Sequence, residues 1–334
     1  MNYVYRIRES TPEDKQAVLE IHKNVYDGLD YLPEYYDHFQ TSDHVTSYVY
    51  MENDEIIAYL ACSVVDNGET IVTRAGRVSP SRQGRHLYGH FISEIETVHR
   101  AGGKTKRHAL VKITTPSNSF LKFYKPVAAK AIHMYEYANS VVSIKTAEFI
   151  SKFSKLNSHA KTFETFPVEF LQYPYSKYLF PEERIIVDWV PFRLSSTNVP
   201  LLKGRDTVFY SDITSETAKV DDLKNEHTDD TGRIQGLLSA CTIFKAQQKF
   251  DLSCNLDIFG LDFRTIENHM IFHLQRINDT GMDNVNLRVY TSKTACDISL
   301  LHSTLEQFGI QAVTNRTREE QYIEQVVYEK DISI

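Results

Sequence analysis

The stretch Arg77–Phe91, RVSPSRQGRHLYGHF, decides how the first part of this chain is expected to fold. Residues up to Val78 read as a strand. From residue 83 to residue 101 apolar residues recur at helical spacing, and Gly102 ends that run. The stretch therefore predicts a strand that turns into a helix. The start of such a helix can hold a phosphate on its backbone N–H groups and the positive end of its dipole.

The segments around this stretch predict a mixed sheet. Strand-like runs at 45–51, 56–65 and 70–79 are joined by turns that contain Asn-Asp and Asn-Gly, which favours an antiparallel meander. Thr11-Pro12 predicts the start of an earlier helix. After the central helix come a strand at 108–114, a short helix at 119–128 stopped near Pro126, and a strand at 131–144.

The last 80 residues repeat this order of elements. Strands at 253–259 and 284–290, helices at 263–277 and 296–308, and closing strands at 311–313 and 321–329 follow one another. The second copy has no glycine-rich turn after its strand, only FGLDF at 259–263. The predicted fold class is α/β (α+β), with one domain at 1–145 and a degenerate second domain at 146–334. Between them, 149–166 predicts a connecting helix, 183–194 a strand and turn, and the acidic segment 211–233 an exposed loop.

Composition limits the possible functions. The chain has 334 residues, 42% of them hydrophobic, and a net charge of −7 without a long basic run, which disfavours sequence-independent nucleic-acid binding. Its four cysteines form no CxxC pair, so we expect buried or idle thiols in a reducing compartment. We find neither a secretory signal nor the ~20 consecutive apolar residues of a membrane span, and expect a soluble, cytoplasmic protein.

The turn after Val78 resembles the phosphate-binding turn Gln/Arg-x-x-Gly-x-Gly/Ala of the GNAT superfamily of N-acetyltransferases. The strings VYDGLDYLPEYY, DNGET, DWVPFRLSSTN, LDIFG and FHLQR, which lie between about residues 5 and 330, resemble the histidine N-acetyltransferase family in the same order. The resemblance implies acetyl-CoA as the acetyl donor and the primary amine of a small molecule as the acceptor. Histidine is the family's named acceptor, and no metal is implied.

The resemblance also implies which residues bind the coenzyme. These are Arg77, Val78, Gln83, Gly84, Arg85, His86, Leu87, Tyr88 and Gly89, followed by Ser117 and Asn118 before a short helix. His86 and Tyr88 stand where the family has small residues, and Arg74 stands where it has an acid. Three interpretations stay open: the backbone still binds the phosphates, the loop is remodelled and binding is lost, or His86 and His90 bind a metal. The last lacks an evident third ligand.

Two further groups of residues are candidates for chemistry. In the GNAT pattern Tyr124 is placed to protonate the departing thiolate, although it could equally be a core aromatic. Tyr26, Asp27, Asp30, Tyr31 and Tyr35 lie on the segment that would cover the acceptor site, where acids and aromatic rings suit a cationic amine. The same residues could simply pack a surface helix. The alternatives to a small-molecule acetyltransferase are a catalytically silent binding module and, less favoured, an enzyme that acetylates a peptide N-terminus or a lysine.

Overall fold

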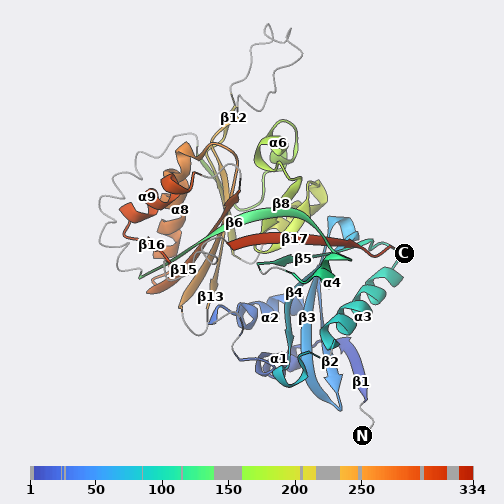
Figure 1. Ribbon diagram of the computed structural model, residues 1–334. Coiled ribbons are helices and arrows are strands. Elements are labelled where there is room, and N and C mark those ends of the chain that lie inside the picture. Colours follow the sequence, from blue (N-terminus) through green and yellow to red (C-terminus); the bar gives the residue numbers. More distant parts are fainter. Residues whose placement is uncertain are drawn as a thin grey trace.

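One mixed sheet of 13 strands connects the two halves of the described chain. The computed structural model describes residues 4–23, 25, 28–84, 86–113, 116–138, 160–203, 206–215, 234–246, 250–293, 297–313 and 323–333. The strand order is β1-β2-β3-β4-β5-β17-β6-β15-β14-β13-β10-β7, and β16 pairs with β6 beside this path. In Figure 1 the first strands (blue) lie at the bottom and the last helices (orange to red) at the upper left.

The N-terminal unit is built on the predicted antiparallel meander. Its elements are β1 (Tyr5–Glu9), α1 (Lys15–Glu20), α2 (Leu32–Thr41), β2 (Val45–Glu52), β3 (Glu55–Val65), β4 (Thr70–Val78), α3 (Leu87–Ala101), β5 (Arg107–Lys112) and α4 (Asn118–Leu121). Side chains alternate between the two faces of β3. Tyr59 packs with the residues of α1 and α2, whereas Leu60 packs with Phe91 and Ile95 of α3. These helices therefore cover opposite faces, as Figure 1 shows.

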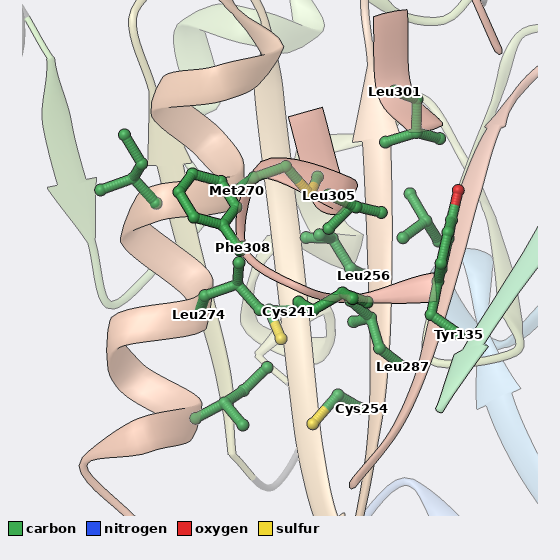
Figure 2. Packing of buried hydrophobic residues seen from close by; sticks show 14 of the residues in the cluster. Tyr135, Cys241, Cys254, Leu256, Met270, Leu274, Leu287, Leu301, Leu305 and Phe308 are labelled. Carbon is green, nitrogen blue, oxygen red and sulfur yellow. The ribbon is translucent and has the colours of Figure 1, made fainter. Parts of the chain in front are cut away.

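The C-terminal unit repeats the order of the N-terminal unit. It contains β10 (Thr207–Ser211), β13 (Leu238–Lys245), β14 (Leu252–Phe259), α8 (Ile266–Asn278), β15 (Asn284–Ser292), α9 (Ile298–Gln307) and β16 (Gln311–Ala312). The core beneath α8 and α9 is apolar and closely packed, with Leu256, Met270, Leu287, Leu305 and Phe308 all buried (Figure 2). The predicted mixed α/β architecture with a second unit of similar element order is confirmed.

Two long strands link the units. β6 (Lys125–Ala138) pairs with β15 of the C-terminal unit, and β17 (Ile323–Asp331) lies between β6 and β5 of the N-terminal unit. The two strands run side by side across the middle of Figure 1. The end of the chain therefore completes the sheet of the first unit. The domain division at residue 145 falls outside the described residues and stays a prediction.

The remaining elements surround the hairpin of β8 (Arg184–Val187) and β9 (Val190–Arg193). Its side chains pack with Val65, Val72 and Ala109 of the N-terminal unit. The segment 183–194, predicted as a strand and turn, is thus a strand and turn followed by a second strand that pairs with the first. The other elements are β7 (Lys161–Phe163), α6 (Tyr175–Leu179), α7 (Val199–Leu202), β11 (Thr214–Ser215) and β12 (Ile234–Gln235).

Several local predictions were wrong. The helix predicted at 119–128 ends at Leu121, and Pro126 lies in β6 opposite Tyr328, where the ladder is irregular because proline donates no hydrogen bond. Residues 161–163 form a strand rather than part of a connecting helix. Asp212, at the start of the segment predicted to be exposed, is 2% exposed and accepts a hydrogen bond from the Leu237 N–H. The rest of that segment, from residue 216 to residue 233, lies outside the described residues.

Three of the four cysteines, Cys62, Cys241 and Cys254, are buried thiols, as predicted, and Cys296 lies outside the described residues. Within the described ranges, we find no helix with both the length and the apolar character needed to cross a membrane.

Candidate active site

The parallel pairing of β4 with β5 ends early. The ladder joins Thr70–Val72 to Arg107–Ala109, yet β4 continues to Val78. From Thr73 onward the edge of β4 that faces β5 is not used by that ladder. We call Thr73–Val78 the open edge of β4. Backbone groups on such an edge can bind an extended ligand as a strand would.

A β-bulge lies in the middle of the open edge. Arg77 pairs with Tyr59 and Arg74 with Ala61, so Ala75 and Gly76 share one partner position at Leu60. Ala75 has a positive φ of 52°, which is unusual for a residue with a side chain. Its N–H is turned out of the ladder and donates to the Tyr31 hydroxyl at 2.9 Å. The bulge thus presents a backbone donor toward the segment before α2.

The start of α3 lies next to the open edge and is accessible. His86, the residue before α3, is left-handed with φ 56° and provides no side-chain cap. Gly84 is left-handed as well, and a Cβ added at Gly84 or Gly89 would meet nothing within 4 Å. Gln83 is exposed. The N–H groups at this helix start are therefore available to an anion, as the first interpretation of the loop requires.

The arginines near the loop already have acidic partners. Arg77 is almost completely buried and forms two hydrogen bonds with Asp30, at 3.0 and 3.1 Å. Arg82 forms an ion pair with Glu52. Arg85 lies outside the described residues. Arg77 and Arg82 thus already use their charge on Asp30 and Glu52, and an anion at this loop would be held by backbone N–H groups.

Tyr88 points from α3 toward the bulge. A Cβ added at Gly76 would collide with the Tyr88 hydroxyl, so a side chain at position 76 is incompatible with this packing. Tyr88 keeps 39% of its surface exposed, but its hydroxyl end is enclosed, and this burial raises the pKa of the phenol. The Tyr88 side chain therefore lies beside β4 at Gly76, and an extended ligand at that position requires it to turn aside.

Tyr124 belongs to a buried polar cluster between α3, β5 and α4. Its hydroxyl lies 2.9 Å from His108 Nδ1 and 3.3 Å from Glu96 Oε1, and His108 Nε2 lies 3.0 Å from the Thr73 hydroxyl on the open edge. Burial raises the pKa of Tyr124, which keeps the phenol protonated at neutral pH, the form a proton donor needs. Tyr124 was singled out from the sequence as a candidate proton donor, and that role stays a prediction, whereas Glu96 and His108 were missed.

The charge state of this cluster follows from its contacts. Burial opposes a charge on Glu96, but hydrogen bonds from His108 and Lys330 outweigh it and lower the pKa of the carboxyl. Burial lowers the pKa of His108 despite the nearby carboxylate. We therefore assign a neutral His108 with its proton on Nδ1, because Glu96 can only accept, and Lys330 as the cation beside Glu96.

Ser117 and Asn118 are exposed at the start of α4, and the Ser117 hydroxyl accepts from the Phe120 N–H at 3.4 Å. This contact caps α4 and so orients the short segment that leads to Tyr124. Their predicted coenzyme contacts stay predictions, as do those of Val78 and Leu87, which flank the loop on either side.

The residues predicted to cover the acceptor meet a residue from the second half of the chain. Tyr35 donates to Asp188 Oδ2 at 3.1 Å, and the Arg74 Nη2 group lies 3.0 Å from the same oxygen and 2.9 Å from the Asp188 carbonyl. The Arg74 guanidinium also lies over the rings of Tyr31 and Tyr35, at 5.6 and 5.7 Å. Tyr26 and Asp27 lie outside the described residues.

Asp188 was not among the residues singled out from sequence. It lies in the β8–β9 turn with φ 46°, followed by Trp189 with φ 65°, and bulky residues seldom adopt this conformation. The available signal was the string DWVPFRLSSTN, in which Asp-Trp occupies a place where a turn prefers glycine or asparagine.

Comparisons with known proteins agree with this architecture. Residues 167–225 match the family model "Histidine N-acetyltransferase, C-terminal". The histidine N-acetyltransferase of Scomber australasicus is 23% identical over 97% of this chain and 92% of its own, and that of Oreochromis niloticus is 23% identical over 84% and 82%. The chain is thus similar to histidine N-acetyltransferases along nearly its whole length. The resemblance inferred from sequence is thereby confirmed, and the chain is counted among the acetyltransferase enzymes.

A solved structure is also similar to this chain over both units. The tandem GNAT protein from the clavulanic acid biosynthesis pathway covers 98% of this chain and 98% of its own, with a TM-score of 0.50 and 8% identity. At that identity the match shows the fold alone. It supports two GNAT-like units in succession.

Proposed function

We propose that this enzyme transfers an acetyl group from acetyl-CoA to the primary amine of a small molecule, with histidine or a related amino acid as the first acceptor to test. The observation that carries the proposal is the position of the open edge of β4 beside the uncapped start of α3. The helix start would hold the diphosphate. Gln83, Gly84, His86 and Gly89 would contribute their backbone, and the extended arm of the coenzyme would follow β4 toward the bulge.

The proposed reaction uses the residues around the bulge. The neutral amine attacks the acetyl carbonyl carbon, the carbon–sulfur bond breaks, and the thiolate takes up a proton from the Tyr124 hydroxyl. The amine nitrogen loses one proton to water, so that the products are the N-acetyl amine and free coenzyme A. Tyr124 regains its proton from solvent through the cluster of Glu96 and His108. Holding amine and thioester in this geometry supplies a large part of the rate acceleration.

A second candidate function rests on Tyr88. Because its hydroxyl lies against Gly76, the path along β4 is filled by a side chain in this conformation. If Tyr88 cannot turn aside, the chain is a catalytically silent module that keeps the two-unit body. We favour the enzyme because Tyr88 is 39% exposed at the helix start, from which we infer that its ring can turn outward into solvent.

Thiol release from acetyl-CoA, measured across a panel of amines, tests the proposal. Tyr124→Phe should lower kcat about 10²–10⁴-fold, the usual contribution of a positioned proton donor. The matched control is Tyr328→Phe, because Tyr328 is also 7% exposed and lies in the same small cluster. Tyr328→Phe should retain most of the activity. Equal losses in both variants would remove Tyr124 from the reaction, and no turnover of any amine by the unaltered protein would favour the silent module.

A further inference from the structure

A cavity lies where the acceptor side of the N-terminal unit meets the β8–β9 hairpin. Its volume is about 220 Å³, and its lining includes Tyr35, His38, Arg74, Asp188 and Lys203. Arg74 directly precedes Ala75 of the bulge, so one wall of the cavity adjoins the proposed position of the thioester. The volume lies below the roughly 300–1,000 Å³ of sites for larger ligands and suits a molecule of amino-acid size.

Arg74 is a buried cation with hydrogen-bonding capacity left over. Its side chain is 10% exposed, and both of its hydrogen bonds to Asp188 come from Nη2. The buried Nε of Arg74 has no hydrogen-bond partner. Buried donors are normally paired, and a guanidinium binds carboxylates through two neighbouring N–H groups. Because Arg74 lines the cavity, its unpaired donor points to a ligand that carries a carboxylate.

The fixed charges of the lining favour an anion. Among the lining residues, all in the described part of the chain, Arg74 and Lys203 are positive and Asp188 carries the sole carboxylate. The excess is 2 − 1 = +1 at neutral pH before any contribution from His38 and His44, which also line the cavity. A ligand of net charge −1 balances this excess, whereas a neutral or cationic amino acid does not.

We propose that this cavity binds the acceptor and selects an amino dicarboxylate, an acidic α-amino acid, over histidine. One carboxylate would pair with Arg74, the amine would lie near Asp188 and Tyr35, and the second carboxylate would face Lys203 at the exposed end. The proposal rests on the proposed acetyl transfer. It makes the Arg74–Asp188 pair, formed between residues 114 positions apart, the determinant of acceptor choice.

The first experiment measures kcat/KM for thiol release with glutamate, aspartate, glutamine, asparagine and histidine. The acids should exceed their amides and histidine at least tenfold. Glutamine and asparagine serve as neutral counterparts of the same shape. Equal or higher kcat/KM for the amides or for histidine would overturn the charge selection while leaving acetyl transfer intact.

The second experiment replaces the charged pair without leaving a lone buried charge. Arg74→Gln combined with Asp188→Asn should reduce the acid-to-amide ratio at least tenfold. Arg184→Gln is the matched control, since the Arg184 side chain is also 10% exposed and paired with an acid, Glu329, but lies outside this cavity. A ratio that survives in the double variant, with an unchanged melting temperature, would overturn the role of the pair.

A binding measurement separates the two proposals. If no amine supports thiol release, calorimetry with glutamate and glutamine in the presence of coenzyme A still reports on the cavity. If glutamate binds more tightly than glutamine and the double variant loses this preference, the proposed binding site is supported even though the proposed reaction is excluded. The absence of glutamate binding overturns the site itself.

Discussion

The two units contain the same pair of parallel strands joined through a helix, but the strands pair to different lengths. β4 and β5 share three paired positions, Thr70–Val72 with Arg107–Ala109, whereas β14 and β15 share six, from Leu252 with Val285 to Asp257 with Tyr290. In each unit the first of these parallel strands also pairs with an antiparallel neighbour, and these pairings differ too. The pairing of β3 with β4 is interrupted by the bulge, whereas β13 pairs with β14 over eight positions without a shift. An open edge is thus found in the N-terminal unit.

The start of the helix that follows the first parallel strand is also more open to a ligand in the N-terminal unit than in the C-terminal unit. α3 begins behind His86 with no side-chain cap, whereas the turn before α8 is capped by Asp262, which accepts from the Arg264 N–H. Hydrogen bonds from Arg264 lower the pKa of Asp262, so a carboxylate sits where a phosphate would have to bind. In the proposed account, the N-terminal unit binds the coenzyme, and the C-terminal unit supports it by supplying β17 and, through the preceding hairpin, Asp188.

The largest expected effect tests whether the two units fold together. Leu287→Ala removes a side chain that is 1% exposed in the core of Figure 2 and should lower the free energy of unfolding by about 2–5 kcal/mol. Because β17 and β6 cross between the units, thermal unfolding should remain one transition. The control is Leu261→Ala, which removes a side chain that is 47% exposed and should change the free energy of unfolding little. A separate, unshifted transition of the N-terminal unit would contradict the linkage.

A smaller effect is expected at the bulge. Gly76→Ala should destabilise by about 1–3 kcal/mol, as overpacking does, because the added methyl group meets the Tyr88 hydroxyl. The double variant Gly76→Ala with Tyr88→Ala lacks the clashing hydroxyl and should recover much of the stability lost in Gly76→Ala. Gly89→Ala, in open space on α3, should instead stabilise by about 0.5–1 kcal/mol. Denaturant unfolding measures all three, and a Gly76→Ala variant as stable as the parent would show that Tyr88 does not hold this position.

Acid should weaken the fold through the partly buried His133 of β6, the strand that links the two units. Burial and His302 lower the pKa of His133 to about 4, so above the ordinary value near 6.5 its stabilising contribution is complete. As the pH falls from 6.5 toward 4 the unfolded chain binds the proton first, and stability is lost. His133→Gln should reduce that loss by about 1–2 kcal/mol at pH 5. His90→Gln, at an exposed residue, is the control, and an unchanged pH profile in His133→Gln would contradict this assignment.

The order of elements was predictable because it depends on local periodicity. The meander from Val45 to Val78 and the helix from Ile266 follow from alternating and helical spacing, and each lies where the pattern predicts it. The candidate Tyr124 came from the GNAT pattern of a short helix after a strand, and its role in the reaction stays a prediction. These features depend on neighbours within a few positions along the chain.

The rest depends on partners far away in sequence. Nothing near Ile323 indicates that this strand inserts between β5 and β6, and nothing near Arg74 indicates its pairing with Asp188. Asp212 lies in an acidic segment that suggested exposure, yet hydrogen bonds from Leu237 and His269 hold it inside. The local sequence shows that such residues are charged, but it does not show the distant partners whose hydrogen bonds offset the cost of burying that charge.

The claim that the N-terminal unit alone binds the coenzyme is tested most directly by titration calorimetry with coenzyme A. The parent protein should bind one equivalent. Gly89→Asp places a carboxylate in the first turn of α3, where it favours the helix but repels a diphosphate, and should weaken binding at least tenfold without lowering the melting temperature. Leu261→Asp, at the corresponding turn of the C-terminal unit, should leave binding unchanged. Two equivalents bound by the parent, or a loss of binding in Leu261→Asp alone, would contradict the account.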